Sequence, residues 1–144
     1  MSFLHFTYTL QLMIGELLVG QAEIIPTDHT DFPYLISAPT MRTPMTIHRS
    51  PNVYLTMKAI LTLLKYGKFE NGELIKHKVK TVALSGLGTG VGQVSPLLCA
   101  RSMRIAWEDV VNEKFKTEKG WEELRSNYAY FFTHHDRDIT YDIP

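Results

Sequence analysis

The stretch from Ser85 to Pro96 reads Ser-Gly-Leu-Gly-Thr-Gly-Val-Gly-Gln-Val-Ser-Pro. It follows the apolar run Val79–Leu84, which is typical of a buried strand, and it precedes apolar residues at helical spacing: Cys99, Met103, Ala106 and Val110. Ser95-Pro96 is a helix-start signal, because serine caps the first turn and proline suits its first position. The pattern therefore predicts a strand, a glycine-rich loop and a helix.

The loop is suited to hold an anion without a cation. Glycine at every second position lets successive backbone N–H groups turn toward one point, and the following helix N-terminus adds partial positive charge. A tight turn without a ligand is the competing interpretation. The predicted ligand-binding residues are Ser85, Gly86, Gly88, Thr89, Gly90, Val91, Gly92 and Gln93.

Two common phosphate motifs are excluded. The nucleoside-triphosphate loop requires a lysine, which this loop lacks. The dinucleotide fingerprint Gly-x-Gly-x-x-Gly fails because Val91 or Gln93 stands at its sixth position.

Outward from the loop, strands and helices alternate. Leu17–Ile25 and Tyr34–Ala38 are predicted as buried strands. A helix is expected to begin at Ser50-Pro51 and to end in a left-handed cap at Gly67, with apolar residues at helical spacing between them: Val53, Met57, Ile60 and Leu64. A third helix is expected over Trp121–Phe132, with a buried face formed by Trp121, Leu124, Tyr128 and Phe131. The order predicts an α/β fold with a largely parallel sheet flanked by helices.

The N-terminal segment, residues 1–14, is atypically apolar. Phe6, Tyr8 and Leu10 alternate with polar residues, which favours a strand, although a helix is also consistent. The segment lacks the basic region of a signal peptide and is interrupted by polar residues, so we expect a soluble, cytoplasmic protein. We also expect a homodimer with this segment near the contact, because it is rich in apolar side chains.

The overall charge gives no indication of a nucleic-acid or membrane partner. Fifteen basic residues balance fifteen acidic ones in 144 residues. The single cysteine, Cys99, cannot form an internal disulfide and is expected in the core. No metal or cofactor is expected.

Three polar groups are weaker candidates. His134, His135, Asp136 and Asp138 could suggest a metal site, but a solvated surface is the simpler interpretation. Asp28, His29 and Asp31 could form an acid–base group or merely a polar loop. Arg42 could reach a phosphate, anchor its loop or face water.

The loop with Gly88-Thr89-Gly90-Val91 and a helix opened by Pro96 resembles the second diphosphate-binding loop of macro domains. Further similarity lies in the runs that start at Gly15, Tyr34 and Asn52, and more loosely in residues 121–137. The resemblance implies a macro-like domain over residues 15–137 with a mixed sheet between helices, and binding of ADP-ribose or an ADP-ribosylated molecule at Ser85–Gln93. The tail at residues 138–144 is expected to be irregular.

Two departures from the family pattern bear on activity. Gly92 stands where the family usually has an aromatic residue that packs on the distal ribose. Nothing before Gly15 matches the first strands, which carry the acidic adenine contact and the asparagine loop. An ADP-ribose binder with little catalysis is therefore one hypothesis; any activity would be that of an ADP-ribose 1″-phosphate phosphatase or ADP-ribosyl hydrolase. A non-catalytic structural or interaction protein that keeps the fold is the alternative.

Overall fold

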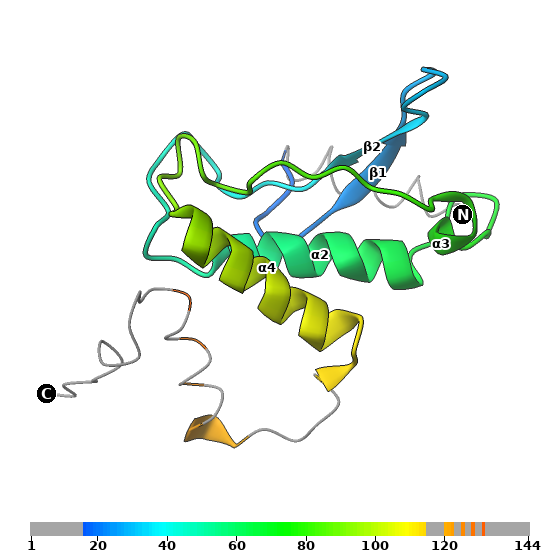
Figure 1. The fold of residues 1–144 in the computed structure, drawn as a ribbon. Helices are drawn as coiled ribbons and strands as arrows, with labels where there is room; N and C mark the ends of the chain where they lie inside the picture. The colour runs from blue at the N-terminus through cyan, green and yellow to red at the C-terminus, as the bar shows by residue number, and fades with distance from the viewer. Residues whose placement is uncertain (1–15, 115–119, 123–124, 126–127, 129–130, 132–144) are drawn as a thin grey trace, which may run out of the picture.

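The computed structural model describes residues 16–114, 120–122, 125, 128 and 131. Its elements are β1 (Glu23–Pro26), β2 (Tyr34–Ser37), α2 (Asn52–Tyr66), α3 (Ile75–Lys78) and α4 (Pro96–Val110), shown in Figure 1. The N-terminal segment and the His134–Asp138 group, for which sequence predictions were made, lie outside these residues.

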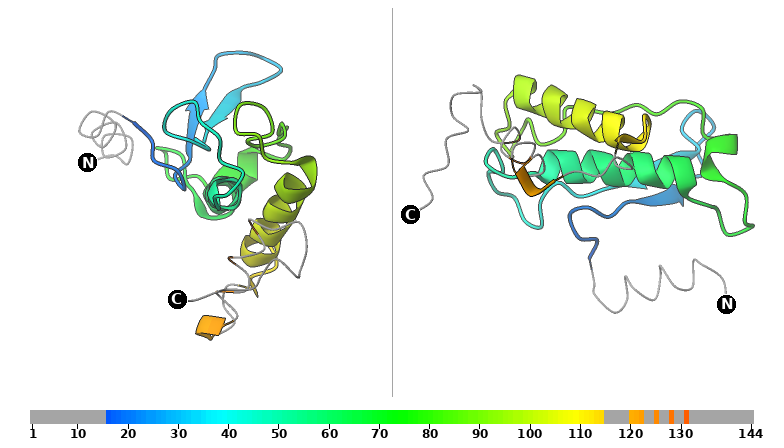
Figure 2. Two further views of the ribbon diagram at one scale, coloured as in Figure 1. Left: turned by 90° about the vertical axis from the view of Figure 1, so that its left-hand side faces the viewer. Right: turned by 90° about the horizontal axis from the view of Figure 1, so that it is seen from below.

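The helices α2 and α4 lie side by side and pack against each other (Figures 1 and 2). Their facing sides contribute to the two main apolar clusters. One cluster lies near the beginnings of both helices and contains Ile47, Val53, Val94, Leu98 and Cys99. The other lies further along the pair and contains Met57, Leu61, Ala106 and Val110. The helical spacing read from the sequence therefore identifies the buried faces of both helices, including the predicted core position of Cys99.

The helix ends agree with the sequence in part. Ser95 caps α4 as predicted, since its hydroxyl accepts a hydrogen bond from the N–H of Leu98 at 3.3 Å. The first long helix begins at Asn52 rather than Pro51, and the Ser50 hydroxyl accepts from the N–H of Asn52 at 3.4 Å.

The left-handed cap predicted at Gly67 is wrong. Gly67 has an extended backbone, with φ −67° and ψ 156°. A Cβ there would lie 2.3 Å from the Leu63 carbonyl oxygen and 2.8 Å from the Ile75 side chain. The glycine therefore allows a close approach between α2 and α3, not a positive φ.

The α/β class is borne out, but the largely parallel sheet is not found among the described residues. β1 and β2 form an antiparallel hairpin in which Glu23 pairs with Ser37 and Pro26 with Tyr34. The predicted strand Val79–Leu84 joins no sheet, and its side chains are mostly exposed. Apolar side chains alone do not make a strand, because a strand also needs a second backbone to pair with, and none of the described residues supplies one to this segment.

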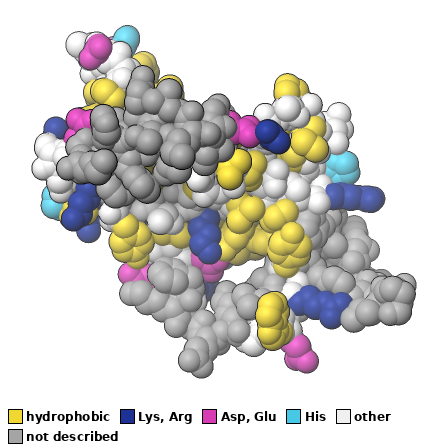
Figure 3. Space-filling view, turned by 180° about the vertical axis from the view of Figure 1, so that it is seen from behind, with side chains coloured by type: hydrophobic (Ala, Val, Ile, Leu, Met, Phe, Trp, Pro, Cys, Tyr) yellow, Lys and Arg dark blue, Asp and Glu magenta, His cyan; other side chains and the backbone are white. Residues whose placement is uncertain are grey.

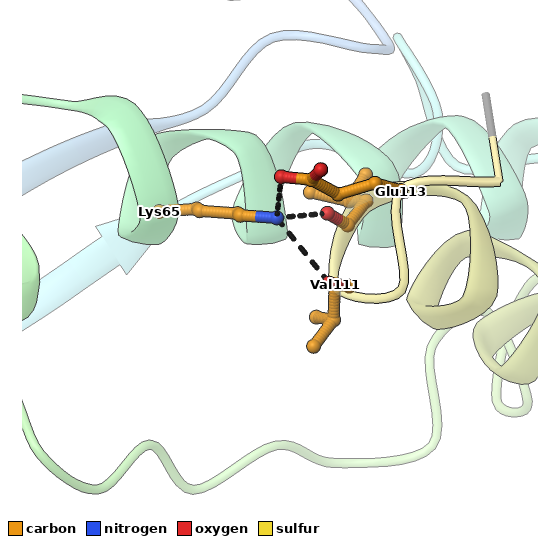
Figure 4. A network of polar contacts seen from close by, with 4 residues as sticks. Lys65, Val111 and Glu113 are labelled. Carbon is orange, nitrogen blue, oxygen red and sulfur yellow. Dashed lines mark hydrogen bonds and ion pairs between the residues drawn. The ribbon is translucent and has the colours of Figure 1, made fainter. Parts of the chain in front are cut away.

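Lys65 holds the far ends of the two long helices together (Figure 4). Its ammonium group donates to the carbonyls of Val110 at 2.7 Å and Val111 at 3.3 Å, and it pairs with Glu113 at 3.0 Å. These carbonyls end α4 and carry partial negative charge, which a cation stabilises. The Glu113 carboxylate raises the pKa of Lys65 above its ordinary value.

The predicted third helix is described only in part. Its predicted buried face is wrong at Trp121, which is 87% exposed, and at Tyr128, which is also exposed. Phe131 is buried and packs on Tyr54 with ring centroids 4.6 Å apart, whereas Leu124 lies outside the described residues. In the part of the chain that the structure covers, no helix has the length and apolar character to cross a membrane.

Candidate anion-binding loop

The glycine-rich loop connects the extended segment Val79–Leu84 to the beginning of α4. Ile47 packs against the loop. Its N–H donates to the Gly92 carbonyl at 2.9 Å, and its side chain lies beside Gly88. Within the loop, Val94 N–H donates to the Gly88 carbonyl at 3.1 Å. Sequence reasoning missed Ile47, because an isolated apolar residue in a proline-containing segment carries no periodic signal.

Two loop glycines are required by the fold itself. Gly88 has φ +70°, and a Cβ there would lie 2.9 Å from the Ile47 side chain. A Cβ at Gly92 would lie 2.5 Å from the Gly88 carbonyl oxygen. An aromatic residue at position 92 is therefore incompatible with this loop, which explains its departure from the family pattern.

Gly90 differs from both. It does not have a positive φ, and a Cβ built on it meets nothing within 4 Å. The fold of the described chain therefore gives no steric reason for glycine at this position. Gly90 is also exposed to solvent.

Several loop N–H groups remain available. Thr89, Gln93 and Val94 donate within the loop, with N–O distances of 3.3, 3.0 and 3.1 Å. Within the described residues, no hydrogen bond is formed by the backbone N–H groups of Gly88, Gly90, Val91 and Gly92. Available N–H groups at consecutive positions are the donors that an anion-binding nest requires.

The predicted site residues thus occupy one loop but have different roles. Thr89 is committed to the loop, since its hydroxyl donates to the Gly86 carbonyl at 2.9 Å. Gln93 has φ +55° and an exposed side chain, whereas Ser85 precedes the turn in the exposed extended segment. Gly92 is buried, whereas Gly90 and Val91 are exposed, so the best-placed donors are the backbone N–H groups of Gly90 and Val91.

Both long helices begin at this end of the molecule (Figure 1). The end of β2 is tied to α2, because Asn52 donates to the Thr40 carbonyl and Thr56 to the Pro39 carbonyl, each at 2.8 Å. Residues 81–95 carry no charge. Any anion bound here would be held mainly by N–H groups and the helix N-termini.

The other sequence candidates lie outside this loop. Arg42 forms an exposed ion pair with Glu16 at 2.8 Å, which agrees with the anchoring interpretation. His29 and Asp31 lie in the exposed β1–β2 connection, where the Asp31 N–H donates to His29 Nδ1 at 3.2 Å. Burial raises the pKa of the Cys99 thiol, with the Leu87 backbone opposing this effect, so Cys99 is suited to packing rather than nucleophilic chemistry.

A polar cluster between the helices is also distinct from the loop. Tyr54 donates to Asp109 at 2.7 Å, and Lys58 donates to the Tyr54 hydroxyl at 3.0 Å. Burial, followed by the Asp109 carboxylate, raises the pKa of Tyr54 well above its ordinary value. The cluster keeps Tyr54 neutral and joins α2 to α4.

A surface groove of about 510 Å³ lies between the chain leading into β1 and α2. Its lining is mainly small or apolar, with Gly20, Ala22, Leu55 and Ala59 among its residues and Lys58 beside them. Hydrophobic side chains also gather on the back of the molecule in Figure 3.

No group of three or more His, Cys, Asp or Glu side chains suited to a metal ion occurs in the described part.

The family model of the macro domain matches residues 6–103, which include the hairpin, α2, the glycine loop and the first half of α4. Comparisons with curated proteins and with solved structures give no match. The matched range covers more than half of the chain.

Proposed function

The chain belongs to the macro domain family, and we propose that it binds ADP-ribose or a related phosphate-containing nucleotide through Ser85–Gln93. The ligand could be free or attached to an ADP-ribosylated molecule, and the proposed setting is the cytoplasm. The proposal rests on Gly90. Nothing in the described fold requires a glycine at this position, and the backbone N–H groups of Gly90 and Val91 form no hydrogen bond among the described residues.

The diphosphate is proposed to lie against the N–H groups of Gly90 and Val91, which are both exposed. Hydrogen bonds from the N–H groups of Ile47 and Val94 to loop carbonyls hold the loop in place, so the loop would lose little conformational freedom on binding. Val91 is 65% exposed and is the apolar side chain available to contact a sugar. This contact would be smaller than that of the aromatic residue for which Gly92 substitutes.

We propose that catalysis is weak or absent. A general base must be within hydrogen-bond reach of the water that it activates. Residues 81–95 contain no Asp, Glu or His, and Cys99 is buried below the loop. A mixed sheet with further strands, as the family resemblance implies, would be needed to bring additional groups to the loop.

Calorimetric titration of the full chain with ADP-ribose tests the proposal. Wild type should bind, and Gly90→Val should weaken binding at least roughly tenfold, equivalent to about 1.4 kcal/mol. Gly90→Val should change the melting temperature little, because Gly90 is exposed and a Cβ there meets nothing within 4 Å. Ala100→Val, an exposed change of similar size on α4, is the matched control and should bind as wild type does.

The non-catalytic structural protein is the second candidate, and two of the loop glycines are equally compatible with it. Gly88 and Gly92 are needed for the loop conformation even without a ligand, so their presence does not discriminate between the two hypotheses. Absence of ADP-ribose binding, or equal affinity in wild type and Gly90→Val, would favour this second candidate. Inorganic pyrophosphate is the additional probe that shows whether the loop alone holds the anion.

A further inference from the structure

Ile47 is a buried residue in an otherwise exposed connection between β2 and α2. It is 3% exposed, whereas residues 42–46 and 48–49 on either side of it are exposed. This connection lies beside the glycine loop at the beginnings of α2 and α4 (Figure 1). Ile47 is therefore buried by its contacts with the loop and with the apolar cluster that contains Val94 and Leu98.

The Ile47 side chain lies against two glycines of the loop through two different carbon atoms. A Cβ built on Gly88 meets Ile47 Cδ1 at 2.9 Å, and a Cβ built on Gly92 meets Ile47 Cγ1 at 2.8 Å. At both positions only glycine fits without a shift of its neighbours. A single side chain thus determines where two points of the loop backbone lie.

The backbone of Ile47 connects the loop to the chain that leads into α2. Its N–H donates to the Gly92 carbonyl at 2.9 Å, and its carbonyl accepts from both the N–H and the hydroxyl of Ser50, at 3.0 and 2.8 Å. Both backbone polar groups of this buried residue are therefore paired. Ile47 is held on one side by the loop and on the other side by the residue that precedes the first turn of α2.

We propose that Ile47 is a positioning residue for the anion-binding loop. Gly88 and Gly92, which contact Ile47, flank Gly90 and Val91, whose exposed N–H groups are the proposed phosphate donors. Fixing both ends of so short a turn restricts the residues between them, and a site that is already ordered loses less conformational freedom on binding. Ile47 itself is enclosed and touches no ligand. The inference rests on the proposed function for its ligand, whereas its effect on the loop can be measured without one.

Calorimetric titration with ADP-ribose and with inorganic pyrophosphate tests the effect on binding. Ile47→Val removes Cδ1 alone, the atom beside Gly88, and keeps the backbone hydrogen bonds. The looser loop must become ordered on binding, so the affinity for both probes should fall roughly fivefold. Ile60→Val is the matched control, because Ile60 is also 3% exposed but lies on α2, outside the cluster that contains Ile47. It should lose stability as Ile47→Val does and bind as wild type does. Equal losses of affinity in the two variants, or no loss in Ile47→Val, would overturn the proposal.

The connection to α2 has a test of its own. Ser50→Ala removes the hydroxyl that donates to the Ile47 carbonyl, and it should weaken binding less than Ile47→Val does, because the Ser50 N–H still donates. Ser50→Thr keeps a hydroxyl and should restore the wild-type affinity. A threonine variant that binds as weakly as the alanine variant would overturn the role of this hydrogen bond.

Hydrogen exchange of the ligand-free chain separates this proposal from the proposed function. The Val94 amide donates to the Gly88 carbonyl at 3.1 Å, so its exchange rate reports whether Gly88 is held in place. It should exchange roughly tenfold faster in Ile47→Val than in Ile60→Val. Faster exchange together with a wild-type chain that binds neither probe would overturn ADP-ribose binding and support the positioning role. Equal exchange of the Val94 amide in the two variants would overturn the positioning role, whether or not wild type binds ADP-ribose.

Discussion

The helix pair and the extended segments meet at the same glycine loop, yet their apolar residues are in opposite environments. Between α2 and α4, Leu61, Ala106 and Val110 are enclosed on all sides. On the hairpin, the cross-strand pair Ile25 and Leu35 is exposed, as are Val82 and Leu84 in the extended segment. A helix completes its backbone hydrogen bonds within itself, so α2 and α4 need only each other to bury their apolar faces. A strand also needs neighbouring backbone, so the burial of its side chains depends on segments elsewhere in the chain or in another molecule.

The largest expected effect tests whether stability resides in the helix pair. Leu61 is 6% exposed and Leu35 is 59% exposed, so the same truncation can be made in both regions. Leu61→Ala should lower the free energy of unfolding by about 3 kcal/mol, because it leaves a cavity in the core. Leu35→Ala should change it by less than about 0.5 kcal/mol. Chemical denaturation measures both, and a comparable loss in the two variants would show that the hairpin face is covered in solution.

A smaller effect distinguishes Gly88 and Gly92, which the loop conformation requires, from Gly90, which has open space around it. Gly92→Ala should destabilise the fold by about 2 kcal/mol, since a Cβ cannot be placed against the Gly88 carbonyl without moving the backbone. Gly90→Ala is the matched control and should melt as wild type does. A destabilised Gly90→Ala variant would remove the reason for assigning Gly90 to the ligand side of the loop.

The cap of α4 should contribute less. Ser95→Ala removes the acceptor for the Leu98 N–H and should lower stability by about 1 kcal/mol. Ser95→Asp supplies another acceptor and should restore most of this loss. Failure of the aspartate variant to recover stability in thermal unfolding would indicate that Ser95 acts by packing rather than as a cap.

The smallest effect is expected from pH at the other end of the helix pair. A raised pKa means that Lys65 stabilises the fold fully below its ordinary pKa of 10.5 and loses this contribution as pH rises through the folded value. Tyr54 also has a raised pKa and adds its own loss in alkali. The informative quantity is therefore the stability difference between wild type and Lys65→Met, which should shrink above pH 10.5; a difference independent of pH would contradict the role of the ammonium group.

Local sequence patterns predicted much of the helical half. Apolar spacing identified α2 and α4, and Ser95-Pro96 identified the start and cap of α4, because these features depend on residues within one or two turns. The glycine pattern identified the loop for the same reason. The environment of Trp121 was predicted wrongly, since burial depends on what packs against a helix and not on its spacing alone.

By itself, the sequence determined the family, the two long helices, the capped start of α4 and the place of the glycine loop. Only the tertiary structure decided that β1 and β2 pair antiparallel, that Val79–Leu84 has no strand partner among the described residues, and that Gly67 and Gly92 are required by close contacts. It also separated Gly90 from the other loop glycines. These cases have the same physical reason. Strand pairing and close approach involve residues far apart in the chain, such as Ile47 with Gly92, and a local sequence pattern does not indicate which distant residues will meet.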